Sequence, residues 1–197
     1  VNIQGQPREG FISEIKYRTV DDLPCRASSL IIFPDLKNAC MAVSLLKSTP
    51  VQAVELIDRA GLKSVENETG VPSYLKSLNG TASALLVETA AQDKKGLAEK
   101  IKLITESVNS ISTLFGIVFT DEPSEYELLW KIRKGLFPSV GAMRKTGTTV
   151  IIEDVAFPVP RLAEATLDLQ EILRKYHYDE AVIFGHALEG NLHFVFT

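Results

Sequence analysis

Residues 180–196 read EAVIFGHALEGNLHFVF. Two apolar, β-type runs at residues 180–187 and 192–196 flank a short polar stretch that contains Gly190. Such runs on either side of a glycine-containing turn are typical of a β-hairpin. The segment therefore predicts two antiparallel strands joined by a turn at residues 188–191.

The residues before this hairpin predict one more strand and one helix. Residues 149–157 form another β-type run, and Pro160 precedes a segment with helical periodicity. The apolar residues expected to face inward on this helix are Leu162, Ala165, Leu169, Ile172 and Leu173. The last third of the chain is therefore predicted as β-α-β with a closing hairpin.

Strands and helices also alternate in the first two thirds of the sequence. The β-type runs are residues 27–33, 51–57, 81–89 and 116–120. The helical patterns are residues 35–46, with Asp35 as the N-cap, residues 97–111, and residues 123–136, which Pro138 closes. Residues 63–80 are polar and are predicted as a connection. We therefore expect an α+β fold of ferredoxin-like βαβ units, in which helices cover one face of an antiparallel sheet.

The composition indicates a compact globular chain. Of its 197 residues 45% are hydrophobic, which suffices for a packed core. The net charge of -4 is spread along the sequence and argues against nucleic acid as a partner. No apolar run approaches the roughly 20 residues of a membrane helix, so the chain is not expected to span a membrane. Cys25 and Cys40 form no CxxC motif, which favours a reducing cytosol and excludes a cysteine-built metal or iron–sulfur site here.

Two of the three histidines lie in the predicted hairpin. A turn at residues 188–191 pairs Ala187 with Leu192 and makes His186 and His193 directly opposed neighbours. Opposed residues have Cβ atoms about 4.5–5.5 Å apart, so both imidazoles could reach one divalent ion. A catalytic metal takes about three protein ligands, so a carboxylate would have to come from elsewhere. The spacing fits half-buried histidines that bond to sheet neighbours equally well.

Arg133 borders the apolar stripe of the predicted helix at residues 123–136. Its guanidinium could clamp a substrate carboxylate through two parallel hydrogen bonds. Alternatively, its stem packs on the stripe and its head stays in water.

Arg144 and Lys145 form a second small basic group in a loop. Glu153 and Asp154 are adjacent in a strand, so their side chains point to opposite faces and cannot act as an acid–base pair.

Several of these segments are similar to one known family. Residues 185–193 resemble the H-x-G-D-G-N-x-H signature of the FAD-linked oxidases, which include D-lactate dehydrogenase, the flavin-bearing chain of glycolate oxidase, and D-2-hydroxyglutarate dehydrogenase. Residues 153–158 resemble the strand before the cap helix of that family, and residues 129–133 resemble its W-x-x-R helix. Residues 10–15 look like the last strand of the flavin domain, and residues 30–33 look like the first strand of the cap.

The sequence departs from the family pattern at two places. Leu188 and Glu189 replace the usual Gly-Asp, which leaves both histidines in place and alters the turn between them. Ile152 stands where some relatives carry a lysine that helps to bind substrate. The identity of the substrate therefore stays open.

The resemblance implies a division of the chain and a set of site residues. Residues 1–24 would be the end of the FAD-binding domain, and residues 25–197 would be the substrate-binding cap, truncated at its C-terminus. His186 and His193 would act in catalysis by holding a divalent metal such as zinc, and Arg133 and Asn191 would bind the substrate. FAD would be bound mainly by the upstream domain, and long relatives carry an iron–sulfur cluster in a downstream domain.

The implied reaction is oxidation of a small D-2-hydroxy acid, of the D-lactate or D-2-hydroxyglutarate type, to a 2-oxo acid. Electrons would pass through FAD to an acceptor, and the fragment alone would be inactive. A cytoplasmic location, free or peripheral to the inner membrane, is expected. Two alternatives stay open: the cap of a flavin oxidase for another alcohol, and a non-redox ferredoxin-like binding module.

Overall fold

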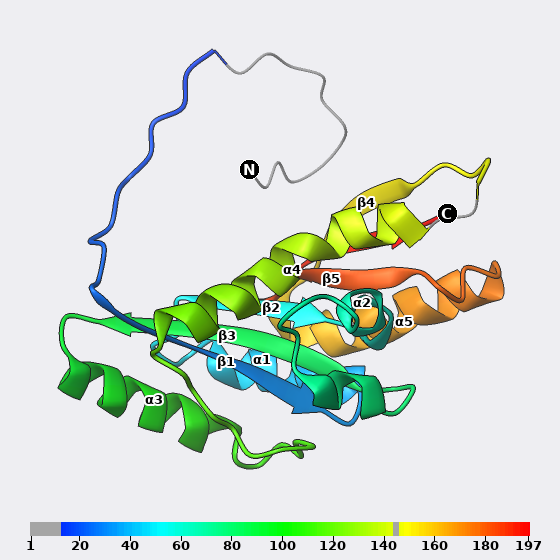
Figure 1. Ribbon diagram of the computed structural model, residues 1–197. Helices are drawn as coiled ribbons and strands as arrows, with labels where there is room; N and C mark the ends of the chain where they lie inside the picture. Colours follow the sequence, from blue (N-terminus) through cyan, green and yellow to red (C-terminus); the bar gives the residue numbers. More distant parts are fainter. Residues whose placement is uncertain (1–12, 144–145) are drawn as a thin grey trace.

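The computed structural model describes residues 13–143 and 146–197. The predicted flavin-domain strand at residues 10–15 falls partly outside this part of the chain, and the basic pair Arg144 and Lys145 falls wholly outside it. Residues 13–24 contain no helix or strand and run as an exposed, extended segment away from the folded body (Figure 1).

The first half of the sheet contains β1 (Cys25–Phe33), β2 (Ala53–Ile57) and β3 (Ser83–Ala91). Strand β3 lies between the other two and pairs antiparallel with each of them. Helix α1 (Leu36–Leu46) connects β1 to β2 and begins where the sequence predicts, because the Asp35 side chain accepts a hydrogen bond of 2.8 Å from the backbone of Asn38.

The second half repeats this arrangement. Strands β4 (Ile151–Ala156) and β5 (Val182–His186) are connected by α5 (Leu162–Lys175), and β6 (Asn191–Phe196) lies between them. The halves join where β2 pairs with β5, which gives the order β1-β3-β2-β5-β6-β4 in the described sheet. This order confirms the predicted α+β class and its ferredoxin-like units.

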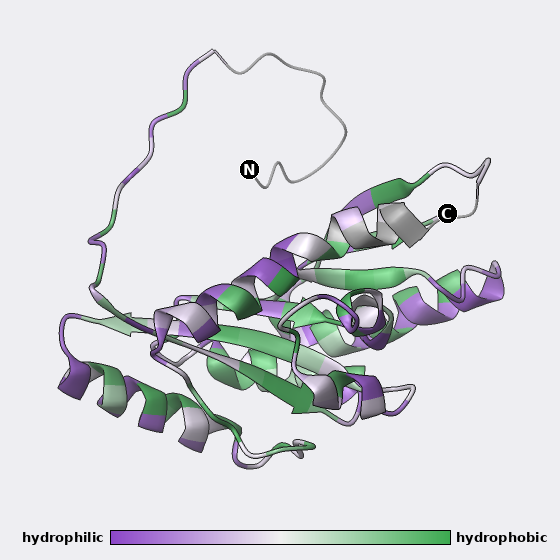
Figure 2. Cartoon of the chain, in the orientation of Figure 1, coloured by the Kyte–Doolittle hydropathy of each residue, from purple (hydrophilic) through white to green (hydrophobic). Residues whose placement is uncertain are grey.

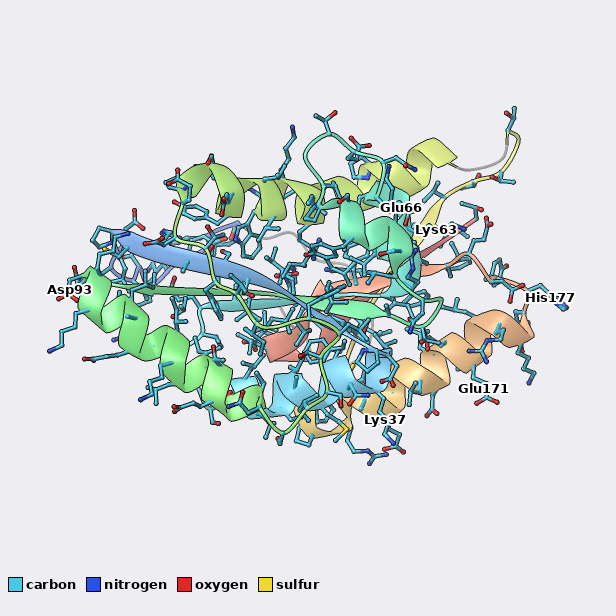
Figure 3. All side chains as sticks on the ribbon, turned by 60° about the horizontal axis from the view of Figure 1, so that its bottom comes forward. Lys37, Lys63, Glu66, Asp93, Glu171 and His177 are labelled. Atoms are coloured by element: carbon cyan, nitrogen blue, oxygen red, sulfur yellow. The ribbon has the colours of Figure 1, made fainter. Side chains whose placement is uncertain are left out.

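Helices cover both faces of the sheet, so the expectation that they cover one face is wrong. Helices α1, α5 and α3 (Lys94–Val108) pack on one face, and α2 (Arg59–Val65) and α4 (Pro123–Met143) pack on the other (Figure 3). The cause lies in the strands, since β3 is mostly hydrophobic (Figure 2), is buried along nearly its whole length, and contributes Leu85 and Val87 to one core cluster and Ala84 to the other. A sheet that is apolar on both faces needs cover on both.

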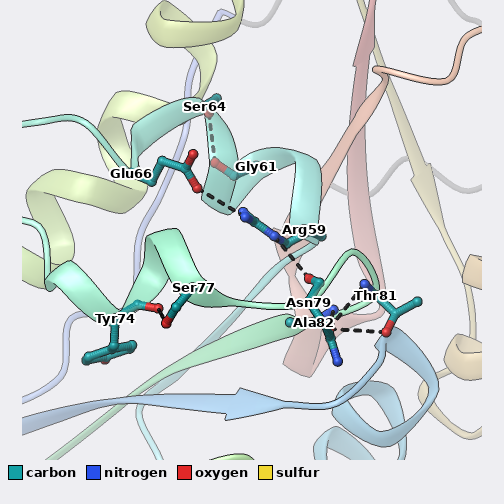
Figure 4. A network of polar contacts seen from close by, with 9 residues as sticks. All are labelled: Arg59, Gly61, Ser64, Glu66, Tyr74, Ser77, Asn79, Thr81 and Ala82. Atoms are coloured by element: carbon teal, nitrogen blue, oxygen red, sulfur yellow. Dashed lines mark hydrogen bonds and ion pairs between the residues drawn. The ribbon is translucent and has the colours of Figure 1, made fainter.

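Residues 63–80 contain more structure than the predicted connection. Helix α2 begins at the Asp58 N-cap, which accepts a hydrogen bond of 2.8 Å from the backbone of Gly61, and a short 3-10 helix, η1, spans Ser73–Ser77. Arg59 ties this region together through Glu66, at 3.1 Å, and the carbonyl of Asn79, at 3.2 Å (Figure 4). Asn79 is 20 residues from Arg59 in the sequence, so local patterns gave no sign of this contact.

Three other expectations were wrong. Residues 116–120 form no strand in the structure, and what remains is one isolated bridge between Ser28 and Thr120. Helix α4 continues through Pro138 to Met143, with Pro138 at an exposed position where water can reach the carbonyl that loses its partner. On α5 Ile172 is 53% exposed rather than inward, since the buried positions of that helix are Leu162, Thr166 and Leu173.

Candidate functional site

The hairpin of β5 and β6 differs in register from the prediction. Phe184, not His186, is the Cα partner of His193, whereas His186 is paired with Glu55 of β2. The predicted direct opposition of the histidines is therefore wrong. The turn is longer than expected because residues 187–189 form a 3-10 helix, η3, which ends at Gly190.

The two histidine rings nevertheless face each other. His186 lies two residues after Phe184 on the same strand, so His186 and His193 share one face of the sheet as diagonal neighbours. Their ring centroids are 5.3 Å apart, with an interplanar angle of 87°. The predicted proximity is confirmed, although the two histidines are diagonal rather than directly opposed neighbours in the hairpin.

A buried carboxylate connects the arginine and histidine that the sequence singled out. Glu55 Oε2 accepts hydrogen bonds from Arg133 Nε, at 2.8 Å, and lies 2.7 Å from Arg133 Nη2. Glu55 Oε1 lies 2.7 Å from His186 Nδ1. The Glu55 side chain is 8% exposed, whereas that of His186 is 55% exposed.

Sequence reasoning missed Glu55. The available signal was one ionisable residue inside the otherwise apolar strand of residues 53–57, since a buried charge needs a partner. That signal could have marked the residue as unusual. It could not have named Arg133 or His186, which are 78 and 131 residues away in sequence.

Arg133 is neither free to clamp a substrate carboxylate with its whole guanidinium nor extended into water, the two environments that its sequence position suggested. Its side chain is only 12% exposed, so its head does not extend into water. The guanidinium instead lies over the ring of Phe184, with Cζ 4.7 Å from the ring centroid, and pairs with Glu55. Nε and Nη2 face Glu55, while Nη1 has no hydrogen bond to the described residues. The role of Arg133 in substrate binding stays a prediction.

His193 has polar neighbours on the adjacent edge strand. Asp154 is its Cα partner in β4, and Asp154 Oδ1 lies 3.6 Å from His193 Nδ1. Burial lowers the pKa of His193 below the ordinary histidine value, with Asp154 opposing this shift and His186 adding to it. The neutral imidazole is favoured as a result, and that is the form that can bind a metal or accept a proton.

Asn191 is held at the start of β6 by a hydrogen bond from its amide to Asp154. It therefore lies beside His193, although its assignment to substrate binding stays a prediction.

Glu153 pairs with Phe194 and points to the other face of β4, as predicted for adjacent strand residues. The third histidine, His177, extends from the outer end of α5, away from this cluster (Figure 3).

Two glycines allow the chain to pass close to itself next to the histidines. Gly190 has a φ of 64°, and a Cβ added there would lie 1.8 Å from the carbonyl oxygen of Phe157. A Cβ added to Gly185 would lie 2.2 Å from the carbonyl oxygen of Asn191. Only glycine fits either position without moving the backbone.

Within residues 13–143 and 146–197, no group of three or more histidine, cysteine, aspartate or glutamate side chains is arranged to hold a metal ion. The donor chemistry of the histidine pair fits a metal in part. His186 Nδ1 lies 2.7 Å from a carboxylate oxygen, and metal-binding histidines hold their second nitrogen in this way, whereas His193 Nδ1 lies 3.6 Å from one, which is beyond hydrogen-bond length. No helix in the described part of the chain is long and apolar enough to cross a membrane.

Comparison with known proteins places this fold and histidine-bearing hairpin in a flavoenzyme family. Residues 24–197 match the model of the FAD linked oxidases, C-terminal domain. The chain belongs to that family, which confirms the family-level resemblance seen in the sequence. No curated protein sequence matches it.

Similar solved structures include two crystal forms titled alkyldihydroxyacetonephosphate synthase. The form in P1 has a TM-score of 0.64 and 13% sequence identity, and the form in P212121 has a TM-score of 0.61 and 12% identity. Each similarity covers 88% of this chain and 36% or 35% of the other. The chain therefore spans about a third of those proteins, and at this identity the likeness shows the fold alone.

Proposed function

We propose that this chain is the substrate-binding cap of an FAD-dependent oxidoreductase that oxidises a D-2-hydroxy acid to a 2-oxo acid. The substrate class is that of D-lactate or D-2-hydroxyglutarate. Residues 1–24 belong to the end of the flavin domain, and residues 25–197 form the cap. The partners are that flavin domain and an electron acceptor, in some relatives reached through an iron–sulfur domain, and the enzyme works in the cytoplasm or at the inner-membrane surface.

The observation that carries this proposal is the connection of Arg133 to the histidine pair through Glu55. A 2-hydroxy acid carries a carboxylate on the carbon next to its hydroxyl-bearing carbon. It therefore needs a cation for the carboxylate and, close by, a group that receives the hydroxyl proton. Arg133 and His186 share the oxygens of one carboxylate, so they lie close together on one face of the sheet.

Each residue has a definite task in this function. Arg133 orients the substrate carboxylate so that the hydrogen on C2 points out of the cap. FAD, when bound, supplies the hydride acceptor. A neutral imidazole of the pair takes the hydroxyl proton, so one hydride and one proton leave the substrate together. Alternatively, His186 and His193 would use their imidazole lone pairs to hold a divalent metal such as zinc, which would lower the pKa of the substrate hydroxyl, and the hydroxyl proton would then pass to water.

A second candidate is a flavoenzyme cap for another alcohol or ether. The observation that favours it is that Glu55 already pairs with Arg133, which leaves fewer guanidinium N–H groups for a substrate carboxylate. The solved structures titled alkyldihydroxyacetonephosphate synthase support the broader point that this cap fold serves more than one substrate.

The test is an assay of the polypeptide in which this cap is joined to its flavin domain. Flavin reduction by D-lactate or D-2-hydroxyglutarate, and not by the L enantiomers, is the expected result. No reduction by any 2-hydroxy acid, with reduction by other alcohols, would favour the second candidate. A parent polypeptide that binds no flavin would leave a non-redox binding module as the better explanation.

A further inference from the structure

Glu55 contacts two residues of the candidate site with different oxygens. Oε2 faces Nε and Nη2 of Arg133, at 2.8 and 2.7 Å, and Oε1 faces Nδ1 of His186, at 2.7 Å. The carboxylate is buried, and the imidazole that it holds is half exposed. We propose that Glu55 is a positioning residue that fixes the tautomer of His186 and the orientation of the Arg133 guanidinium at the same time.

The tautomer follows from the roles that the groups can take. Arg133 carries donors and no acceptor, so its ion-paired partner Glu55 acts as an acceptor. The short contact with His186 then requires a hydrogen on Nδ1, because one of the two atoms must donate. A neutral imidazole has one N–H, so Nε2 carries the lone pair. Nε2 is thus the atom of His186 that binds a metal or receives a substrate proton.

The same carboxylate also restricts Arg133. Two of its guanidinium nitrogens face one oxygen of Glu55, and Cζ lies 4.7 Å from the centroid of the Phe184 ring. The guanidinium is thus held along one edge by Glu55 and across one face by Phe184. These two contacts fix its plane and leave Nη1 for an incoming group. Glu55 and His186 are Cα partners, so the pairing of β2 with β5 sets the distance between the carboxylate and the imidazole.

A role of Glu55 in turnover rests on the function proposed above. The tautomer of His186 does not depend on that function and can be measured directly. The direct test is long-range ¹H–¹⁵N correlation NMR of the ¹⁵N-labelled chain at pH 8, after removal of metals with EDTA. The expected spectrum shows His186 with a protonated Nδ1 and an unprotonated Nε2. The exposed His177 serves as the reference signal in each sample.

Glu55→Gln should reverse the tautomer of His186. The glutamine oxygen can keep the bonds to Arg133, which turns its amide N–H groups toward Nδ1 and moves the imidazole hydrogen to Nε2. Glu153→Gln is the matched control, because it makes the same chemical change on the opposite face of β4 and should leave the His186 signals unchanged. His177 should be unaffected in both variants.

An Nε2–H tautomer in the unmodified chain would overturn the proposal, and this measurement decides the matter even if Glu55→Gln fails to fold. An unchanged tautomer in folded Glu55→Gln would overturn it as well. In the flavin-bearing polypeptide the same substitution should lower kcat by about 10–100-fold, with a smaller change in KM. If the tautomer is as expected but no hydroxy acid is oxidised, the proposed function fails and the positioning role stands.

Discussion

Glu55 is a charged residue at a position where the strand pattern calls for an apolar one. Removing a carboxylate from water is costly, and here the cost is offset by a paired guanidinium and a short contact with an imidazole. Loss of one partner would leave the other charge buried and unpaired, a change that typically costs about 3–5 kcal/mol. The site residues are therefore part of the interior packing, and substitutions there affect both stability and binding.

Arg133→Lys should reduce kcat/KM toward 2-hydroxy acids by about 10-fold or more, because lysine keeps the charge and loses the planar fork. Stability should fall by only about 1 kcal/mol, since an ammonium can still pair with Glu55. Steady-state kinetics and urea unfolding of the flavin-bearing polypeptide would measure the two effects. Arg161→Lys, at an exposed pair with Glu164, is the matched control. Unchanged kinetics in Arg133→Lys would assign Arg133 a structural role.

Asp58 should make stability depend on pH. Burial raises the pKa of this carboxyl from 3.8 to about 7. The folded state therefore keeps a proton that the unfolded state releases, and stability falls as pH rises from about 4 to 7, by up to about 1.4 kcal/mol per pH unit. Asp58→Asn keeps an N-cap acceptor for Gly61 and should remove this trend.

Urea unfolding of both proteins at pH 4.5 and 7.5 measures this effect. The stability of Asp58→Asn relative to the unmodified chain should increase at the higher pH. An equal difference in stability between the two proteins at both pH values would contradict the raised pKa of Asp58. Asp93 provides the control because it is an N-cap with the same kind of contact, to Gly96, at the exposed start of α3 (Figure 3). Asp93→Asn removes a carboxylate there without relieving a buried charge.

At the scale of elements, the sequence predicted local patterns well and long-range pairing poorly. Strands β1 to β6 and helices α1, α3, α4 and α5 were recognised because their hydrophobic periodicity is local, whereas helix α2 was missed and the strand expected at residues 116–120 is absent. The hairpin register was wrong because Ala187 enters a 3-10 turn instead of the ladder, and no local pattern showed this. The contact of Glu55 with His186 depends on how β2 meets β5, which no hairpin or helix pattern encodes.

The turn between the two histidine strands should be sensitive to a single methyl group. Gly190→Ala should destabilise the chain by about 3 kcal/mol or more, because the residue has a positive φ and its new Cβ would overlap the Phe157 carbonyl. Gly147→Ala measures the cost of the backbone conformation alone and should cost about 1 kcal/mol, since Gly147 has a φ of 93° and an added Cβ would meet no atom of the described residues within 4 Å. Thermal and urea unfolding would measure both. Equal losses would show that the close approach is unimportant.

At the scale of the whole molecule, two similar βαβ-based halves form one sheet, and the candidate site lies at their seam. Each half contributes different chemistry, since β2 provides Glu55 while β5 and β6 provide His186 and His193. Neither half alone carries the full cluster. The sequence could indicate the repeated pattern, but the seam appears only when the order of strands is known.

The chain alone should not retain FAD. Its sequence has no glycine-rich loop of the kind that holds a pyrophosphate at a helix N-terminus. The purified chain, incubated with FAD and passed through a desalting column, should show no flavin absorbance. The same procedure with the flavin-bearing polypeptide is the positive control. Stoichiometric flavin on the chain alone would overturn the proposed division between cap and flavin domain.

Zinc should bind this chain weakly. His186 and His193 supply two imidazoles where a catalytic site takes about three protein ligands. The nearby carboxylates have other partners, because Glu55 pairs with Arg133 and Asp154 accepts a hydrogen bond from Asn191. Calorimetric titration with zinc should therefore show weak binding that His186→Ala removes.

His177→Ala, which changes an exposed histidine away from the pair, is the matched control for that titration and should leave it unchanged. In the flavin-bearing polypeptide, loss of either paired histidine should remove bound metal and cut turnover sharply, because each would supply one of the few protein ligands of the metal. A purely structural pair would instead lower stability and preserve turnover per folded molecule. Metal content, unfolding and activity measured on the same His193→Ala sample distinguish the two roles, and normal turnover without metal would exclude metal assistance at this site.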